Sequence, residues 1–324
     1  MNYSDRIPKI PSRKHLSPAA TPASVAMTGG LRTMGFVRED SPGKPLVTVA
    51  TVVLNARDTL RTTIESILEQ SYSNLELIVL DGGSCDGTLD LIRTYDQLVD
   101  FWASEKDEGP YFAMNKAAKL ASGRWILFMN AGDWFLNAEA VSNALHHAPR
   151  DADFIIGHHV YRTVDGQKEL HKANDSDISW NLLQAGELDG YWLQGIPGHQ
   201  ATFTRVALLR EHGYDTTFRI AADHDFFYRM KAKGCSFFHC GIPLSVYNAG
   251  GFSAKHSSLC ISEWERTCLA HSGVPDKVRA FFADVRAYDR EKSTTVPDRE
   301  SPEKPMTKPI GRRARIFEFF RKLV

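Results

Sequence analysis

The sequence lacks several features that would define other classes of protein. It has no run of about 18 or more apolar residues, so it predicts no membrane-spanning helix, and its N-terminus has no apolar signal-peptide core. Five cysteines without a C-x-x-C pair fit reduced cytosolic thiols better than a disulfide framework. The formal net charge of +0 provides no bulk field for nucleic acid. We therefore expect a cytoplasmic protein with no nucleic-acid partner.

Both ends of the chain differ in composition from its middle. Residues 1–44 contain five prolines among Ser, Thr, Lys and Arg and show no sustained periodicity, so we expect a disordered tail and a fold that begins at Leu46. Residues 276–324 are expected to form a linker and a basic amphipathic segment. Within it, residues 312–324 mix cationic with apolar side chains. That segment could rest on an anionic membrane surface or dock on its own domain.

Between these ends, apolar runs alternate with amphipathic segments. Residues 47–54 are rich in β-branched side chains, and Leu60, Ile64 and Ile67 then recur at helical spacing, with Asp58 as a possible cap. Strands are expected at 47–54, 75–80, 100–104 and 124–129, and helices from 58, at 88–94, at 110–120 and at 137–147. This alternation predicts right-handed βαβ crossovers and a mostly parallel α/β sheet flanked by helices.

After residue 150 the pattern changes. Asp165-Gly166 marks a hairpin between two extended runs. Further elements are expected at 200–203 (strand), 223–233 (helix), 236–247 (extended) and 257–271 (helix). The second half therefore predicts a mixed extension of the same sheet.

Two expected strands end in acidic turns. The run 125–129 stops at Asn130-Ala131-Gly132-Asp133, and the run 75–80 continues into the loop 81–88, which begins with Asp81. Ligands of open α/β sheets bind at the carboxyl ends of the strands. The two acids therefore indicate a charged, phosphate-bearing ligand.

Four motifs in this order resemble glycosyltransferase family 2, in particular bacterial members that build O-antigen, colanic-acid and other exopolysaccharide repeats. The motifs are Thr51 to Asn55, Asp81 to Thr88, Ser104 to Lys116 and Asn130 to Asp133. The resemblance covers roughly residues 46–255. It implies a GT-A fold over 45–275, with a nucleotide-sugar half at 45–150 and an acceptor half at 151–275, and sugar transfer with inversion.

The resemblance also implies a donor site. It places an acid at Asp81 where the nucleotide base, usually uracil, donates a hydrogen bond; an Asx turn is the other interpretation of this residue. It places the segment with Asp107, Asn115 and Lys116 over the ribose and phosphates, although Lys116 could equally be a solvated helix residue. The remaining donor-binding residues that it implies are Thr51, Val53, Asn55, Gly83, Ser84, Asn130, Ala131 and His199.

Asp133 is the expected metal ligand. The family's motif has two acids near this turn, and only the last is present here. One carboxylate can hold Mg²⁺ or Mn²⁺ together with substrate phosphates and waters. A turn-capping Asp is the alternative.

Asp223 is the expected general base, because it matches the family's acid at the start of a helix behind the acceptor site. Inverting transfer needs a group that takes the proton of the acceptor hydroxyl. An N-cap role fits its position as well, and the two roles are compatible.

The resemblance thus predicts an inverting hexosyltransferase with a UDP-sugar donor, a metal ion and an oligosaccharide or lipid-linked acceptor. Such a protein would be cytoplasmic or peripheral at the inner face of the plasma membrane, in contact through 312–324. Two alternatives stay open. A nucleotidyltransferase would carry a Gly-rich basic loop after the first strand, which 55–58 is not. The incomplete metal motif also permits a non-catalytic assembly partner.

Overall fold

The computed structural model describes residues 27–41, 43–163, 165–188 and 196–294. Their contacts divide the chain into two compact units. The first unit contains the described residues up to 160 together with 198–219 and 236–247, and the second contains the rest. The chain passes between the units several times, so they do not coincide with the sequence halves 45–150 and 151–275.

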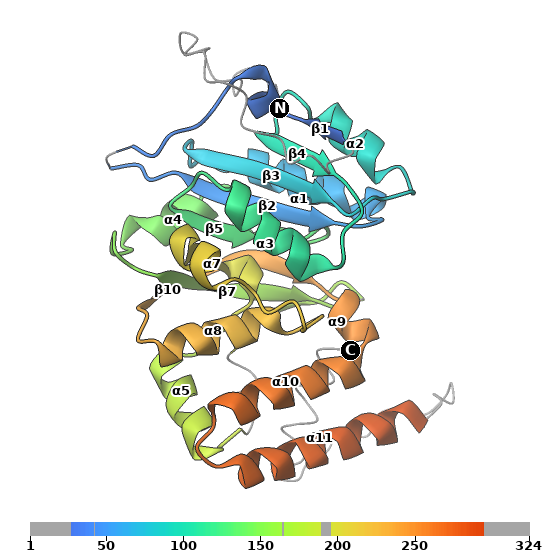
Figure 1. Cartoon of the computed structure of the whole chain (residues 1–324), viewed down its shortest axis with the longest axis vertical. Helices are drawn as coiled ribbons and strands as arrows, with labels where there is room; N and C mark the ends of the chain where they lie inside the picture. The colour runs from blue at the N-terminus through green and yellow to red at the C-terminus, as the bar shows by residue number, and fades with distance from the viewer. Residues whose placement is uncertain (1–26, 42, 164, 189–195, 295–324) are drawn as a thin grey trace. The chain divides into compact units, whose positions relative to one another are not determined.

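The first unit is built on four parallel strands in the order β4-β3-β2-β5 (Figure 1). They are β2 (Val47–Val53), β3 (Leu75–Asp81), β4 (Phe101–Ser104) and β5 (Trp125–Phe128). Every residue of β2, β3 and β5 is buried. This explains their continuous apolar runs, because parallel strands are covered by helices on both faces.

Antiparallel strands extend this sheet on the side of β5. The order continues β9-β7-β10-β6, and β8 pairs with β7. Their bounds are β6 (Trp134–Phe135), β7 (Phe154–Arg162), β8 (Lys168–His171), β9 (Thr202–Arg205) and β10 (Phe237–Asn248). The expected α/β fold, a parallel core with a mixed extension, is confirmed.

The helices of the first unit connect these strands. They are α1 (Arg57–Leu68), α2 (Thr88–Thr94), α3 (Pro110–Leu120), α4 (Ala140–His146) and α7 (Val206–His212). Helix α1 buries Leu60, Ile64 and Ile67, as their spacing predicts. Its N-cap is Ala56 without a side-chain hydrogen bond, so the expected cap at Asp58 is wrong. Helix α3 begins at Pro110. Proline fits this position because the N–H that it lacks would make no hydrogen bond within the first turn.

The expectation of a disordered tail over 1–44 does not hold for its last part. Strand β1 (Met27–Gly29) pairs antiparallel with β4, and the 3₁₀ turn η2 (Leu31–Met34) follows it. Gly29 lies against Trp102, where an added Cβ would come within 2.4 Å of the indole. A side-chain-free residue thus lets β1 approach the sheet closely. Residues 1–26 lie outside the described part of the chain.

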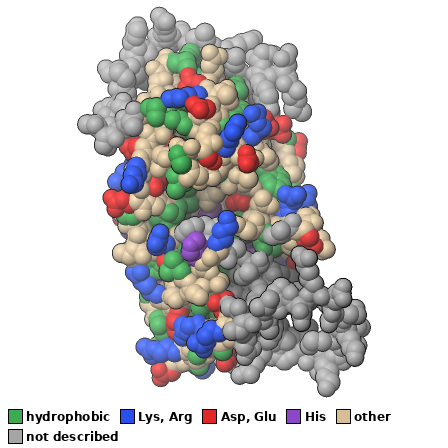
Figure 2. Space-filling view, turned by 90° about the vertical axis from the view of Figure 1, so that its right-hand side faces the viewer, with side chains coloured by type: hydrophobic (Ala, Val, Ile, Leu, Met, Phe, Trp, Pro, Cys, Tyr) green, Lys and Arg blue, Asp and Glu red, His purple; other side chains and the backbone are tan. Residues whose placement is uncertain are grey.

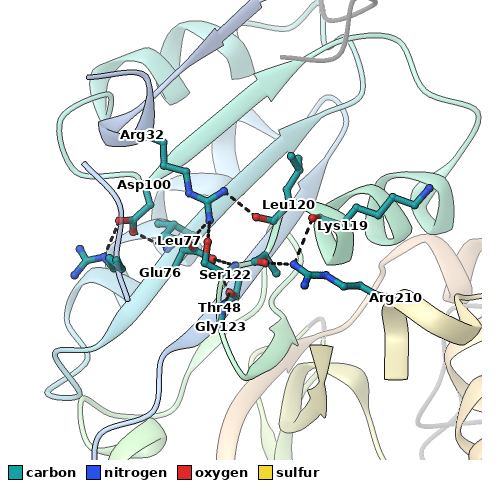
Figure 3. A network of polar contacts seen from close by, with 12 residues as sticks. Arg32, Thr48, Glu76, Leu77, Asp100, Lys119, Leu120, Ser122, Gly123 and Arg210 are labelled. Atoms are coloured by element: carbon teal, nitrogen blue, oxygen red, sulfur yellow. Dashed lines mark hydrogen bonds and ion pairs between the residues drawn. The ribbon is translucent and has the colours of Figure 1, made fainter. Parts of the chain in front are cut away.

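A buried polar network joins this N-terminal segment to the sheet (Figure 3). Glu76 on β3 is fully buried; it forms an ion pair with Arg32 and accepts a hydrogen bond from the Thr48 hydroxyl at 2.6 Å. Arg32 also donates to the Leu120 carbonyl, at the C-terminal end of α3, at 2.8 Å. Arg210 donates to the Ala118 carbonyl of the same helix end at 2.9 Å. Two cations therefore neutralise the carbonyl end of α3.

The second unit is largely helical. It contains α5 (Ser176–Ala185), α8 (Ala222–Ala232), α9 (Phe252–Lys255), α10 (Ser257–His271) and α11 (Pro275–Thr294). Helix α11 occupies much of the stretch 276–311, where a linker was expected. Its residues Val278, Phe282 and Val285 are buried, and this apolar periodicity is what orders the segment. The amphipathic segment 312–324 lies outside the described residues.

Acidic and basic side chains are interspersed over the face shown in Figure 2, in keeping with the balanced composition. A bilayer-spanning helix is absent from the described part of the chain.

Candidate functional site

The carboxyl ends of the parallel strands meet at one edge of the first unit. The register pairs Val53 with Asp81, and Asp81 with Ser104, so the last residues of β2, β3 and β4 lie abreast. On the other side of β2, Ala50 pairs with Phe128, which places the turn after β5 at the same edge. Three of the four motifs in the sequence therefore begin at this edge, and the fourth ends there.

Asp81 is buried and occupied by neighbouring groups. It is 3% exposed, and its carboxylate accepts hydrogen bonds from the Ser84 hydroxyl at 2.5 Å and the Ser104 hydroxyl at 2.6 Å. The Ser84 N–H also points to this carboxylate, at 3.2 and 3.3 Å from its two oxygens. The structure therefore supports the turn-forming interpretation of Asp81. Ser104 is not singled out by the motifs, although its place at the end of a strand is a usable signal.

The loops after β2 and β3 are tied together by Asn55 and Ser84. The Asn55 N–H donates to the Ser84 hydroxyl at 2.7 Å, and the Asn55 side-chain oxygen accepts from the Cys85 N–H at 2.9 Å. Asn55 adopts a positive φ of 50°, which Asn tolerates better than most residues. Thr51 and Val53 are buried within β2. These two expected donor-binding residues thus pack within the sheet near its edge.

The loop after β4 lies against the glycines of the loop after β3. Gly83, with φ +86°, packs on the backbone of Lys106. The Asp107 side chain covers Gly82, and its carboxylate accepts a hydrogen bond from the Gly109 N–H at 3.0 Å. Partial burial raises the pKa of the Asp107 carboxyl above its ordinary value, and the negative charges of Asp81 and Glu105 add to this effect.

Helix α3 holds the other two expected residues of this segment in internal contacts. Lys116 forms an ion pair with Glu105. The Asn115 side chain donates to the Tyr214 carbonyl at 2.9 Å and accepts from the Tyr214 N–H at 2.8 Å. Asn115 therefore fixes the 213–214 backbone against α3, a role that its motif does not suggest.

The turn after β5 is anchored by Thr63 of α1. The Thr63 hydroxyl donates to the Asp133 carbonyl at 2.8 Å and accepts from the Gly132 N–H at 2.9 Å. The Asp133 side chain is 6% exposed, and Ala131 is half-buried beside it. The Asn130 Nδ2 lies 2.9 Å from the Nε2 of His199, in the 3₁₀ turn η3 (His199–Ala201). Sequence-distant Asn130 and His199 are thus brought together.

The donor atoms of this turn suit a hard divalent cation in part. Asp133 supplies a carboxylate, and the buried side-chain oxygen of Asn130 has no hydrogen-bond partner among the described residues. Oxygen ligands of this kind are those that Mg²⁺ and Mn²⁺ prefer. Within the described part of the chain, three or more His, Cys, Asp or Glu side chains do not gather into a metal-binding group. A metal held here would therefore need further ligands from its substrate.

Asp223 lies in the second unit, in the first turn of α8, and is 5% exposed. The N-cap of this helix is Ala221, so the alternative role of Asp223 as N-cap is wrong. The Glu263 carboxylate of α10 accepts hydrogen bonds from the N–H groups of Ile220 at 2.8 Å and Ala221 at 2.9 Å, just before this helix begins.

Known proteins resemble this chain in sequence and in fold. The family described as glycosyl transferase family 2 matches residues 48–212. A PGL/p-HBAD biosynthesis glycosyltransferase of Mycobacterium bovis is 31% identical over 188 residues, which are 56% of this chain and 68% of that protein. The putative teichuronic acid biosynthesis glycosyltransferase TuaG of Bacillus subtilis is 39% identical over 93 residues, 28% of this chain and 37% of that protein.

Solved structures share the fold at low identity. S. aureus TarS 1–349 in complex with UDP has a TM-score of 0.52 and 17% identity over 77% of this chain and 73% of that one. The mannosyltransferase PcManGT from Pyrobaculum calidifontis, in complex with GDP-Man and Mn²⁺, has a TM-score of 0.50 and 17% identity, over 80% and 83%. These likenesses show a GT-A fold. With the sequence match over half of its length, this chain belongs to glycosyltransferase family 2 and is a glycosyltransferase.

Proposed function

We propose that this glycosyltransferase transfers a sugar, with inversion, from a UDP-linked donor to a growing, lipid-linked surface polysaccharide. The observation that carries the proposal is the shared edge at which Val53, Asp81 and Ser104 lie abreast, next to the turn of Asp133. The TarS structures with UDP and UDP-GlcNAc favour a UDP-linked donor. The match to a teichuronic acid biosynthesis enzyme favours a polysaccharide acceptor.

In this proposal Asp133 and the side-chain oxygen of Asn130 would hold a Mg²⁺ or Mn²⁺ ion. The Mn²⁺ in the PcManGT complex favours the same class of ion. When bound, such an ion offsets the negative charge that develops on the departing diphosphate. Thr63 fixes the turn through two hydrogen bonds, so both oxygen-bearing side chains start from a defined backbone.

Asp223 acts as the general base. Its carboxylate takes the proton of the acceptor hydroxyl while that oxygen attacks the anomeric carbon from the face opposite the diphosphate. The carbon–oxygen bond to the diphosphate breaks as the new glycosidic bond forms, so the configuration is inverted. Asp223 lies in the first turn of α8, which begins at Ala222.

A lipid-linked acceptor would place the reaction at the inner face of the plasma membrane. The segment 312–324, outside the described residues, is our candidate for the membrane contact because of its basic and apolar composition. Family membership sets aside the nucleotidyltransferase alternative. Turnover by the wild type with any donor would exclude the non-catalytic alternative.

A thermal-shift panel of UDP-, GDP- and TDP-sugars, with and without Mn²⁺, tests the donor site. We expect the UDP-sugar with Mn²⁺ to raise the Tm most, since a ligand at 100 times its Kd stabilises the folded chain by about 2.7 kcal/mol. Asp133→Ala should remove the part of the shift that depends on Mn²⁺. Asp151→Ala, at an exposed position, is the matched control. A Tm that no nucleotide raises would refute the donor site.

A further inference from the structure

Two carboxylates flank the loop after β3, and they differ in what they can still accept. The Asp81 oxygens are taken up by Ser84 and Ser104 in the buried turn. Asp107 is only half-buried, and one of its oxygens, Oδ1, accepts from the Gly109 N–H. Its other oxygen, Oδ2, accepts no hydrogen bond from the residues that the structure describes. Of these two carboxylates, Asp107 is therefore the one with an open oxygen.

Because residue 82 is a glycine, there is room beside its backbone for the open oxygen of Asp107. A Cβ added to Gly82 would lie 2.9 Å from Oδ2 of Asp107 and 3.2 Å from its Cγ. The Asp107 carboxylate thus occupies the space above the Gly82 backbone, next to the last residue of β3. This position lies at the edge formed by the strand ends, because Asp107 closely follows Ser104, the last residue of β4, which pairs with Asp81.

The surrounding charges determine which part of a donor can bind there. Asp81 and Glu105 both add negative potential at Asp107, and Lys116, which opposes it, is paired with Glu105. A phosphate would be repelled from this position. A neutral group with an N–H donor would be attracted, because hydrogen bonds to a charged acceptor are the stronger class.

We propose that Asp107, rather than Asp81, accepts a hydrogen bond from the ring N–H of the donor's nucleobase, and that Gly82 makes room for it. One open oxygen matches the single imide N–H of uracil or thymine. Guanine presents two adjacent donors and would pair best with both oxygens, one of which Gly109 already engages. The inference rests on the proposed function and refines it toward UDP- or TDP-linked donors.

Calorimetric titration of the full chain with UDP and with N3-methyl-UDP, which lacks the imide N–H, tests this assignment. Asp107→Asn should weaken UDP binding about tenfold or more, the equivalent of a hydrogen bond to a charged group. The same substitution should leave the weaker N3-methyl-UDP binding unchanged. Glu108→Gln, which removes the adjacent exposed acid, should leave both affinities unchanged.

A second variant alters the geometry and keeps the carboxylate. Gly82→Ala should displace the Asp107 side chain and weaken UDP binding in the same way, with little effect on N3-methyl-UDP. If Asp107→Asn and Gly82→Ala bind UDP like the wild type, or if 2′-deoxy-UDP rather than N3-methyl-UDP removes the effect of Asp107→Asn, the inference is wrong. If the wild type binds no UDP at all, the proposed function itself fails.

UDP binding should also depend on pH through Asp107. Burial, Asp81 and Glu105 raise the pKa of this carboxyl, while Gly109 and Lys116 lower it, and the net shift is upward. Only the ionised form accepts the imide N–H strongly. UDP affinity should therefore fall as the pH is lowered. Because the pKa of Asp107 is raised, the fall should begin at a higher pH than an ordinary aspartate, with a pKa of about 3.9, would give. The titration should lose this step in Asp107→Asn; a step that persists there contradicts the assignment.

Discussion

Asp223→Asn is expected to lower kcat for sugar transfer by about 100- to 10,000-fold, the range over which a positioned general base contributes. The variant keeps the size and nearly the shape of the side chain and removes its basicity. The N-cap of α8 is Ala221, so the substitution leaves the capping residue unchanged. The measurement is release of UDP and formation of the glycoside, with the product's anomeric configuration assigned by NMR.

Asp276→Asn is the matched control. Asp276 and Asp223 each occupy the second residue of a helix, α11 and α8, but the Asp276 side chain is 99% exposed and forms an ion pair with Arg279. We expect wild-type kcat for this variant. UDP binding should survive in Asp223→Asn, which separates loss of the base from loss of the donor site. An Asp223→Asn variant that turns over like the wild type would reject the assignment, and a wild type inactive with every donor would favour the non-catalytic alternative.

Arg32→Met should destabilise the first unit by about 3 kcal/mol, because it leaves the fully buried Glu76 without its cation. For a protein of this size the corresponding drop in Tm is on the order of 10 °C. Arg32 pairs with Glu76 near the start of β3, whereas the candidate site lies at the end of that strand. UDP affinity measured well below the Tm should therefore stay close to that of the wild type.

A double variant tests the cause of this loss. Arg32→Met combined with Glu76→Gln removes the buried charge, so it should recover part of the stability lost in Arg32→Met alone. Arg279→Met breaks an exposed pair and should change the stability by less than about 1 kcal/mol. If Arg32→Met melts within a degree of the wild type, Arg32 is not the group that compensates Glu76.

The parallel half of the fold is visible in the sequence because its signals are local. Helices α3 and α10 follow the predicted ranges 110–120 and 257–271, the first marked by Pro110. Strand β1 escapes prediction because its stability comes from a non-local pairing. Met27 is matched with Ser104, and Gly29 contributes only a close approach to Trp102. A three-residue strand has no periodicity from which it could be recognised.

The candidate site shows the same division. Asp81 and Asp133 each follow an apolar run, the first directly and the second after the turn that begins at Asn130, so their shared edge is predictable. The hydrogen-bond partners of each side chain are not predictable in this way. Asn115 is paired with a backbone 99 residues away in sequence, and Asp81 is satisfied in part by a hydroxyl on the next strand. Such pairings depend on register, which residue spacing alone does not define.

The pairing of β1 with β4 limits how far this enzyme can be truncated from its N-terminus. The family match starts at residue 48, past β1, η2 and Arg32. A polypeptide that starts at residue 48 would retain every residue at the carboxyl ends of β2, β3, β4 and β5. It would also expose the outer edge of β4 to intermolecular pairing and leave the buried Glu76 near the start of β3 without its cation. The family match begins at residue 48, whereas the structure that packs against the sheet begins at β1, at Met27. The matched segment is therefore shorter than the segment needed for the fold.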